Sequence, residues 1–165
     1  MAKTIHVELS EQSIVKAIRE IEAYQAEIKR KADLLAKRLA VLGATNVSLG
    51  YSRAIYSGNK DITVSVEKRQ KGYAIVANGE SVLFVEFGAG ATYGYGHPEN
   101  DKFGLGPGTY PSDKGHWDDP KGWWIPKDQG GGHTYGNAPS MTMYRAEQDL
   151  QQEILAIAQE VFGND

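Results

Sequence analysis

The chain has 165 residues, a length typical of one domain that can bury a core without disulfides or metal staples. Its net charge of −3 and apolar content of 41% are ordinary for a globular protein and do not indicate a nucleic-acid-binding or membrane-surface protein. Because the sequence holds no cysteine, disulfides and thiolate zinc sites are excluded.

The N-terminal stretch MAKTIHVEL, residues 1–9, lacks the apolar run of a signal peptide. No window approaches the roughly 18 consecutive apolar residues of a membrane span. We therefore expect a protein that folds in the cytoplasm and does not enter a membrane. Alternation of Ile5, Val7 and Leu9 with polar residues predicts a weak strand or an extended N-terminal arm over residues 1–9.

A long first helix is predicted from Glu11 to Leu42, with Ser10 as N-cap and Gly43 as C-cap. A heptad-like stripe with one polar interruption runs along it through Ile14, Ile18, Ile21, Gln25, Ile28, Ala32, Leu35, Leu39 and Leu42. This stripe has two interpretations. We favour core packing against a sheet, and the alternative is that part of it packs on another subunit.

An antiparallel sheet of three to four strands is predicted within residues 46–87. Apolar residues alternate in 46–57 and again in 60–68, and a polar turn follows at residues 69–72. The dipeptide Asn78-Gly79 between two apolar runs predicts a hairpin that joins the last two strands.

We predict a long loop over residues 88–138, because this segment is rich in glycine, proline and tryptophan. They hold 13 of the 19 glycines, 5 of the 6 prolines and all three tryptophans. A loop of this length in a small domain indicates a functional segment. After Pro139 the apolar period of a helix returns through Met143, Ala146, Leu150, Ile154, Ile157 and Val161. The predicted fold is a single α+β domain, residues 1–165, with the C-terminal helix packed on the sheet.

Five loop aromatics are the predicted interaction residues: Phe103, Tyr110, Trp117, Trp123 and Trp124. Because disordered segments are poor in aromatic residues, we expect this loop to order against its own domain or against a neighbouring subunit. Stacking on nucleic-acid bases is disfavoured by the acidic balance of the loop, whereas stacking of the tryptophans on sugars stays open.

Catalytic and metal sites are weakly indicated. His97, His116 and His133 lie in the loop at spacings that match no compact ligand motif, so we expect solvent-exposed histidines; the alternative is a metal-dependent hydrolase. Glu86 ends an apolar run and has no second catalytic group at a motif spacing. We expect it to pair with a cation or to accept amide protons from the adjacent glycine turn. We therefore predict no enzyme activity, no cofactor and no metal.

Two short motifs flank the loop in a specific order. VEFGAG, residues 85–90, is followed by the Trp-Trp pair and then by HTYGNAPSMTMYRA, residues 133–146. Over roughly residues 10–162 the chain resembles the tail-component family of long-tailed bacteriophages, which is related in role to the lambda tail-completion protein. Ala89 stands where threonine is usual in that family. The matching residues are Glu86, Phe87, Gly88, Gly90, Pro139, Met143 and Ala146.

The resemblance implies a structural protein of the virion neck, the head-to-tail interface, assembled in the host bacterial cytoplasm. Such proteins are ring-forming adaptors, here expected to be hexameric, that join the head-closure or connector ring to the tail-terminator ring or tail tube. DNA would pass through the lumen of the ring without specific binding. A head-closure or tail-terminator ring protein is the nearest alternative, and a carbohydrate-binding module that uses the loop tryptophans is an alternative of another class.

Overall fold

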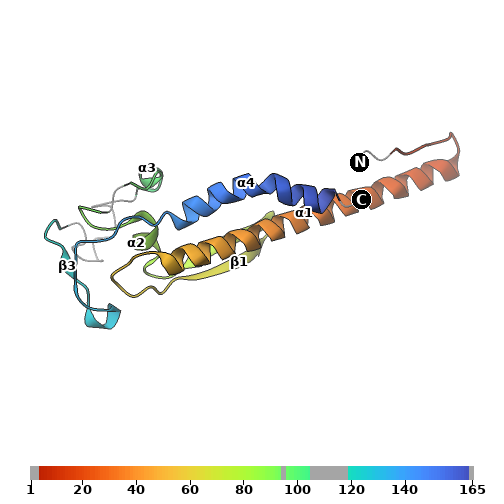
Figure 1. The fold of residues 1–165 in the computed structure, drawn as a ribbon. Coiled ribbons are helices and arrows are strands. Elements are labelled where there is room, and N and C mark those ends of the chain that lie inside the picture. Colours follow the sequence, from red (N-terminus) through yellow and green to blue (C-terminus); the bar gives the residue numbers. More distant parts are fainter. Residues whose placement is uncertain (1–3, 94–95, 105–118, 164–165) are drawn as a thin grey trace.

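The computed structural model describes residues 4–93, 96–104 and 119–163. One long helix, α1, spans the molecule, and a β-hairpin and the C-terminal helix α4 lie along its C-terminal half (Figure 1). The predicted α+β class is therefore confirmed. The elements are α1 (Glu11–Arg53), β1 (Thr63–Arg69), β2 (Gly72–Asn78), α2 (Val82–Phe87), α3 (Asn100–Phe103), β3 (Trp123–Trp124), the 3-10 helix η2 (Lys127–Gln129), β4 (His133–Thr134) and α4 (Thr142–Phe162).

The first helix begins as predicted. The Ser10 hydroxyl caps the helix by accepting a hydrogen bond from Ser13 N at 3.3 Å, and Glu8 N donates to Ser13 Oγ at 2.9 Å, which ties the preceding segment to the first turn. Residues 4–9 form no strand, which leaves the extended-arm interpretation for the described part of the N-terminal segment.

The end of α1 was predicted wrongly. The helix does not stop at Gly43 and continues to Arg53, through residues that the alternating pattern had assigned to a strand. Val47 and Tyr51 fit an alternating pattern, but they are also one helical turn apart. Both are buried on one side of α1, so the helical period is the one that the fold uses. Three hydrogen bonds from Lys60 Nζ to the carbonyls of Tyr51, Ser52 and Ala54 stabilise the C-terminus, at 3.3, 2.9 and 2.9 Å.

Gly43 is a packing residue in the middle of α1. A Cβ atom at this position would collide with Ile75 Cδ1 of β2 and lie 2.8 Å from Leu150 Cδ1 of α4. Strand β2 and helix α4 therefore meet over the bare backbone of α1. The absence of a side chain at Gly43 allows this contact. The packing gained in this way outweighs the low helix propensity of glycine.

Only two strands form the main sheet among the described residues. β1 and β2 pair antiparallel from Thr63↔Asn78 to Arg69↔Gly72, around the turn predicted at residues 69–72. The predicted sheet of three to four strands is wrong, because residues 46–53 are helical and Val82–Phe87 forms α2. The second sheet, β3 with β4, has two residues in each strand.

Asn78-Gly79 joins β2 to α2 and forms no hairpin. Asp61 determines this geometry, because its carboxylate accepts hydrogen bonds from Glu80 N at 2.6 Å, from Ser81 N at 3.0 Å and from Ser81 Oγ at 2.5 Å. These donors turn the chain into α2 directly after the strand. The hydrogen bonds from Ser81 lower the pKa of Asp61 to about 2.

The core lies where the C-terminal half of α1 meets α2, the hairpin and the start of α4. Val47 and Val85 are 1% and 0% exposed, and Tyr51 and Ala146 complete the buried cluster. The C-terminal helix packs mainly on α1 rather than across a broad sheet, because the sheet has only two strands. None of the described helices is long and apolar enough to cross a membrane.

Candidate functional site

The two short motifs that flank the loop, residues 85–90 and 133–146, meet in space. Ala89 and Asn137 form an antiparallel bridge, in which Ala89 N donates to Asn137 O at 2.9 Å and Asn137 N donates to Ala89 O at 3.0 Å. Ser140 N donates to Val85 O at 2.8 Å, and Met141 N donates to Glu86 O at 3.2 Å. Segments about fifty residues apart in the sequence therefore form one structural unit at the junction of α2 and α4.

This junction explains the glycines of both motifs. Gly88, Gly90 and Gly136 have φ values of 80°, 91° and 101°, in the region that favours glycine. A Cβ on Gly136 would collide with the Ala89 carbonyl, and one on Gly88 would lie 2.8 Å from Pro139 N. The glycines serve close backbone packing, and the chain here has no room for side chains.

Glu86 is buried, 4% exposed, at the N-terminus of α4. Its carboxylate accepts hydrogen bonds from Met143 N at 2.9 and 3.0 Å, from Tyr144 N at 3.2 Å and from the Tyr51 hydroxyl at 3.0 Å. Helix α4 has no side-chain cap of its own at Met141, so Glu86 supplies the anion that the first turn of a helix favours. Glu86 does accept amide protons, but from α4 and not from the predicted glycine turn.

Tyr51 joins this unit to α1. Burial and the neighbouring Glu86 carboxylate raise the pKa of the Tyr51 phenol far above its usual range. The hydroxyl therefore keeps its proton and remains a hydrogen-bond donor. Through Tyr51 and Glu86, the long first helix determines where the last helix begins.

His97 is buried, which corrects the expectation of an exposed loop histidine. Its side chain is 2% exposed, and its Nε2 lies 3.5 Å from Glu86 Oε1. Glu99 N donates to His97 Nδ1 at 3.1 Å, so in the neutral tautomer the proton is on Nε2, which makes no hydrogen bond to the described residues. The imidazole also packs 4.2 Å from the Phe87 ring and 5.7 Å from the Tyr144 ring, counted between centroids.

The contacts of the buried cluster of Glu86, Tyr51 and His97 indicate a structural role. Both oxygens of Glu86 already accept hydrogen bonds from backbone or phenol donors, which tie the side chain to α4 and α1. His133 lies elsewhere, 5.2 Å from the Trp124 ring, and His116 lies outside the described residues. Within the described ranges no three histidine, aspartate or glutamate side chains gather as metal ligands.

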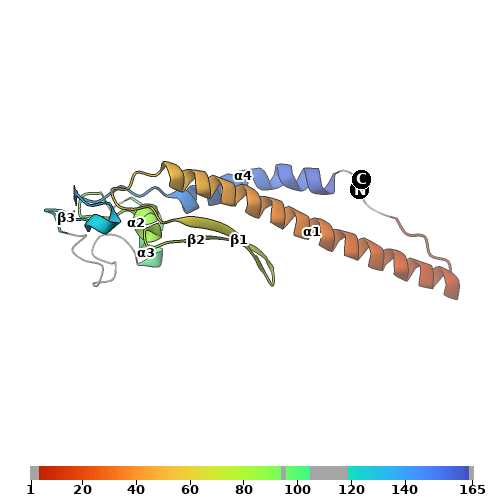
Figure 2. The ribbon, with the colours of Figure 1, turned by 90° about the horizontal axis from the view of Figure 1, so that it is seen from below.

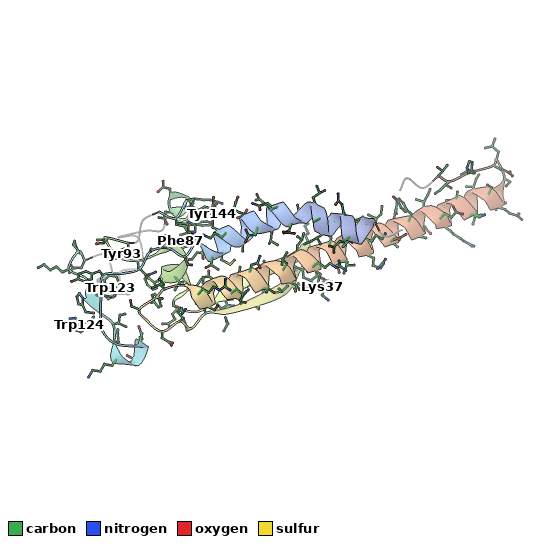
Figure 3. The ribbon with its side chains drawn as sticks, in the orientation of Figure 1. Lys37, Phe87, Tyr93, Trp123, Trp124 and Tyr144 are labelled. Carbon is green, nitrogen blue, oxygen red and sulfur yellow. The ribbon has the colours of Figure 1, made fainter. Side chains whose placement is uncertain are left out.

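Trp123 and Trp124 lie at the end of the molecule remote from the start of α1 (Figure 3). Trp124 is 75% exposed and contacts His133, which stacks edge-on with Tyr135 at 5.0 Å. Trp123 is half-buried beside a hollow of about 660 Å³. Phe103 is 54% exposed, 5.9 Å from the Phe87 ring. Tyr110 and Trp117 lie outside the described residues.

The N-terminal half of α1 extends away from the rest of the domain as a single helix (Figures 1 and 2). We call residues 11–30 the projecting segment. Ala17 is its one buried residue. Its apolar side chains remain exposed by 38–50%: Ile14, Val15, Ile18, Ile21, Tyr24 and Ile28. The first half of the predicted stripe is therefore not core.

A second apolar surface lies on the body of the domain. The apolar groove, as we call it, has a volume of about 750 Å³ and runs over α1 between β2 and α4 to α2 and α3. Its apolar lining includes Leu39, Ile75, Leu83, Phe103 and Leu150. Two of these are substantially exposed, Leu83 by 44% and Phe103 by 54%.

Sequence reasoning missed several of these features. Asn137 is 8% exposed, and its side-chain amide donates to Phe84 O at 2.9 Å, a role that the sequence analysis did not assign to it. The apolar groove depends on the meeting of α4 and β2 over Gly43, and no local pattern predicts it. A glycine inside a strongly periodic helix was the one available signal.

The chain matches no family model, no curated protein and no solved structure in the comparisons with known proteins.

Proposed function

We propose that the protein is a structural subunit of the neck of a long-tailed bacteriophage, a ring-forming tail completion protein between the head-closure and tail-terminator rings. The observation that carries the proposal is the pair of uncovered apolar surfaces on one elongated subunit. Monomeric proteins rarely leave large contiguous apolar patches in water, and such patches mark interaction sites. The rings would assemble in the host cytoplasm and function in the virion.

The two short motifs on which the resemblance rests form one packed unit. Its two halves hold each other through the Ala89–Asn137 bridge, and Glu86 holds α4 in place. Conformational constraints of this kind explain why these residue types occur together at these positions. The motif thus defines a subunit scaffold, and the surfaces proposed to reach partners are the projecting segment, the apolar groove on the body and the exposed aromatic end.

The exposed aromatic end suits contact with an adjacent ring. Trp124 and Phe103 are exposed by 75% and 54%. Tryptophan and tyrosine contribute strongly to protein interfaces, because they bury a large area with few rotatable bonds. The proposed role for Trp117, Trp123 and Trp124 is to anchor the loop on a neighbouring ring or subunit.

The charge of the chain suits a DNA channel. A net charge of −3 repels phosphates, so DNA would slide through the lumen of the ring without binding. Tight, salt-sensitive DNA binding by the purified protein would contradict this part of the proposal.

The test of the function is whether the protein binds phage particles. Purified protein is mixed with tails or heads that lack it, and the joined particles are counted by sedimentation and electron microscopy. We expect the wild type to join, and a folded Trp117→Ala, Trp123→Ala, Trp124→Ala variant to lose joining at least tenfold. Failure of the wild type to associate with any particle would overturn the proposal. Binding to tails only, to heads only, or to both separates tail completion from head closure and tail termination.

Carbohydrate binding is the second candidate. The hollow beside Trp123 and Trp124 is also lined by Tyr56, Phe84 and polar groups that include Asn59 and Gln129. Aromatic faces beside a few polar groups can hold a sugar ring. Titration with a glycan panel, followed by tryptophan fluorescence, would detect it, and saturable quenching by one glycan would favour this candidate over assembly.

A further inference from the structure

We infer that subunits associate head to tail, with the projecting segment of one copy seated in the apolar groove of the next copy. The inference deepens the proposed function and rests on it for the closure of the chain of subunits into a ring. The contact itself follows from two surfaces that the same chain presents.

The convex surface is the apolar side of the projecting segment. Ile14, Ile18, Ile21 and Ile28 stand at alternating steps of four, three and seven residues, and each is exposed by 41–50%. The opposite face carries small or polar residues, such as Ala23 and Ala26. An amphipathic helix with such anchors binds by laying its apolar side into a groove.

The concave surface is the apolar groove over the C-terminal half of α1. Its floor along α1 runs from Ala36 to Tyr51, which is about 22 Å at 1.5 Å per residue; Val47 and Tyr51 are buried at the far end of this floor, where Leu83 and Phe103 supply the exposed lining. The apolar side of the projecting segment runs from Ile14 to Ile28, or about 21 Å by the same rise. The two surfaces therefore match in length as well as in chemistry.

Charged residues give the contact a direction. Lys71, at the hairpin turn, lines one end of the groove, and Glu147, in the first turns of α4, lines the other end. Glu22 and Lys29 occupy equivalent positions beside the apolar stripe of the projecting segment, two turns apart. Opposite charges meet when Glu22 lies toward Lys71 and Lys29 toward Glu147. In that arrangement the inserted helix runs in the same direction as the α1 of its host and crosses it at an angle, because strictly parallel axes displaced along the helix would give an open filament and not a ring.

A head-to-tail contact also explains why both surfaces exist. Pairing of two projecting segments by a twofold axis would cover the stripes and leave both grooves in water. Insertion of the segment into the groove covers both surfaces at every contact. Because the two surfaces lie at different places on one subunit, the contact is heterologous, and such contacts generate rings when the rotation closes.

The experiment uses single-cysteine variants, which the cysteine-free chain makes unambiguous. Full-length Ile28→Cys and Phe103→Cys are purified separately, mixed under mild oxidation and examined for disulfide-linked dimers. We expect a dimer in the mixture, and much less in either variant alone. Ala23→Cys mixed with Phe103→Cys is the matched control from the opposite face of the same helix and should give at least tenfold less dimer.

Other results would overturn the inference. A strong dimer from Ile28→Cys alone would mean that projecting segments pair with each other. Cross-linking of Ile28→Cys to Lys71→Cys in place of Phe103→Cys would contradict the parallel direction. Absence of any specific dimer, together with a monomer mass for the wild type at high concentration, would overturn the association itself.

A second variant pair provides a readout without cysteine. Ile21→Glu should weaken self-association at least tenfold in sedimentation measurements, whereas Ala23→Glu should leave it within about twofold. Equal behaviour of the two would contradict a contact through the apolar side. These measurements use the protein alone, so their failure is distinct from failure to join phage particles, which would overturn the proposed neck function.

Discussion

The two halves of α1 share one continuous helix and differ in what covers them. From Ala40 to Tyr51 the helix is covered by the hairpin and α4, and Val47 is 1% exposed. From residue 11 to residue 30 it has a comparable apolar stripe, yet Ile18 is 50% exposed (Figure 2). The difference shows that a helical stripe predicts a contact but does not identify the partner. One half finds its partner in the same chain, and we propose that the other finds it in the next copy.

We expect the largest loss of stability at the most closely packed position in the covered half of α1. Gly43→Val should lower the free energy of unfolding by roughly 3 kcal/mol or more, because Ile75 and Leu150 already occupy the space of a Cβ atom. Ala26→Val, on the exposed side of the projecting segment, is the control and should cost less than about 1 kcal/mol. Urea denaturation would measure both, and similar losses would contradict the difference between the halves.

Glu86→Gln should be the next most damaging change, costing about 2–3 kcal/mol. An amide at this position removes the anion from the start of α4 and turns an NH₂ group toward donors that need an acceptor. Glu153→Gln, an exposed glutamate on α4, should stay within about 0.5 kcal/mol of wild type. Thermal and urea denaturation at matched protein concentrations would compare the two variants. An unchanged stability of Glu86→Gln would contradict the capping of α4 by Glu86.

Alanine substitutions compare the two halves directly. Val47→Ala should cost about 2 kcal/mol through lost burial and a cavity. Ile21→Ala should cost less than about 1 kcal/mol at protein concentrations where the wild type is monomeric, because its side chain is 45% exposed. At higher concentrations the stability of wild type should rise relative to Ile21→Ala, since association stabilises the folded state. A concentration-independent difference would argue against the subunit contact.

The smallest effect should come from Asp61, in the turn before α2. The pKa of Asp61 is about 2 in the folded chain, against 3.8 for the free side chain, so its contribution is complete above about pH 4 and is lost as the pH falls toward 2. Because the carboxylate is largely exposed, solvent screening limits this contribution to below about 1 kcal/mol. Asp61→Asn should therefore flatten the stability profile between pH 4 and pH 2 in acid titrations followed by circular dichroism. An unchanged profile would contradict the assignment.

Local rules predicted the parts of the fold that depend on neighbours in the sequence. The Ser10 cap, the turn before Gly72 and the helix after Pro139 all appear near the predicted positions. The prediction failed where one pattern fits two structures. Residues 46–53 fit both alternation and a helical period, and the VLFVEF run of α2 is rich in strand-forming residues although it folds as a helix beside Asp61.

The candidate site was predicted in part. The motif residues around Glu86 and Pro139 were identified, but the burial of His97 and the capping of α4 by Glu86 were not. Both depend on contacts between segments that are far apart in the chain, so neither leaves a local periodic signal. The tryptophans were predicted as contact residues, and Trp124 is 75% exposed, while the apolar groove had no counterpart in the sequence analysis.

The sequence by itself determined the long amphipathic first helix, the glycine-rich excursion and the final helix, because periodicity and backbone propensity act over a few neighbouring residues. Tertiary structure alone decided where α1 ends, which half of its stripe is covered, and that β2 and α4 meet over Gly43. The physical reason is that burial is settled between distant segments. A helix can present the same apolar side along its whole length, and only the arrangement of the other elements determines how much of it remains for a partner.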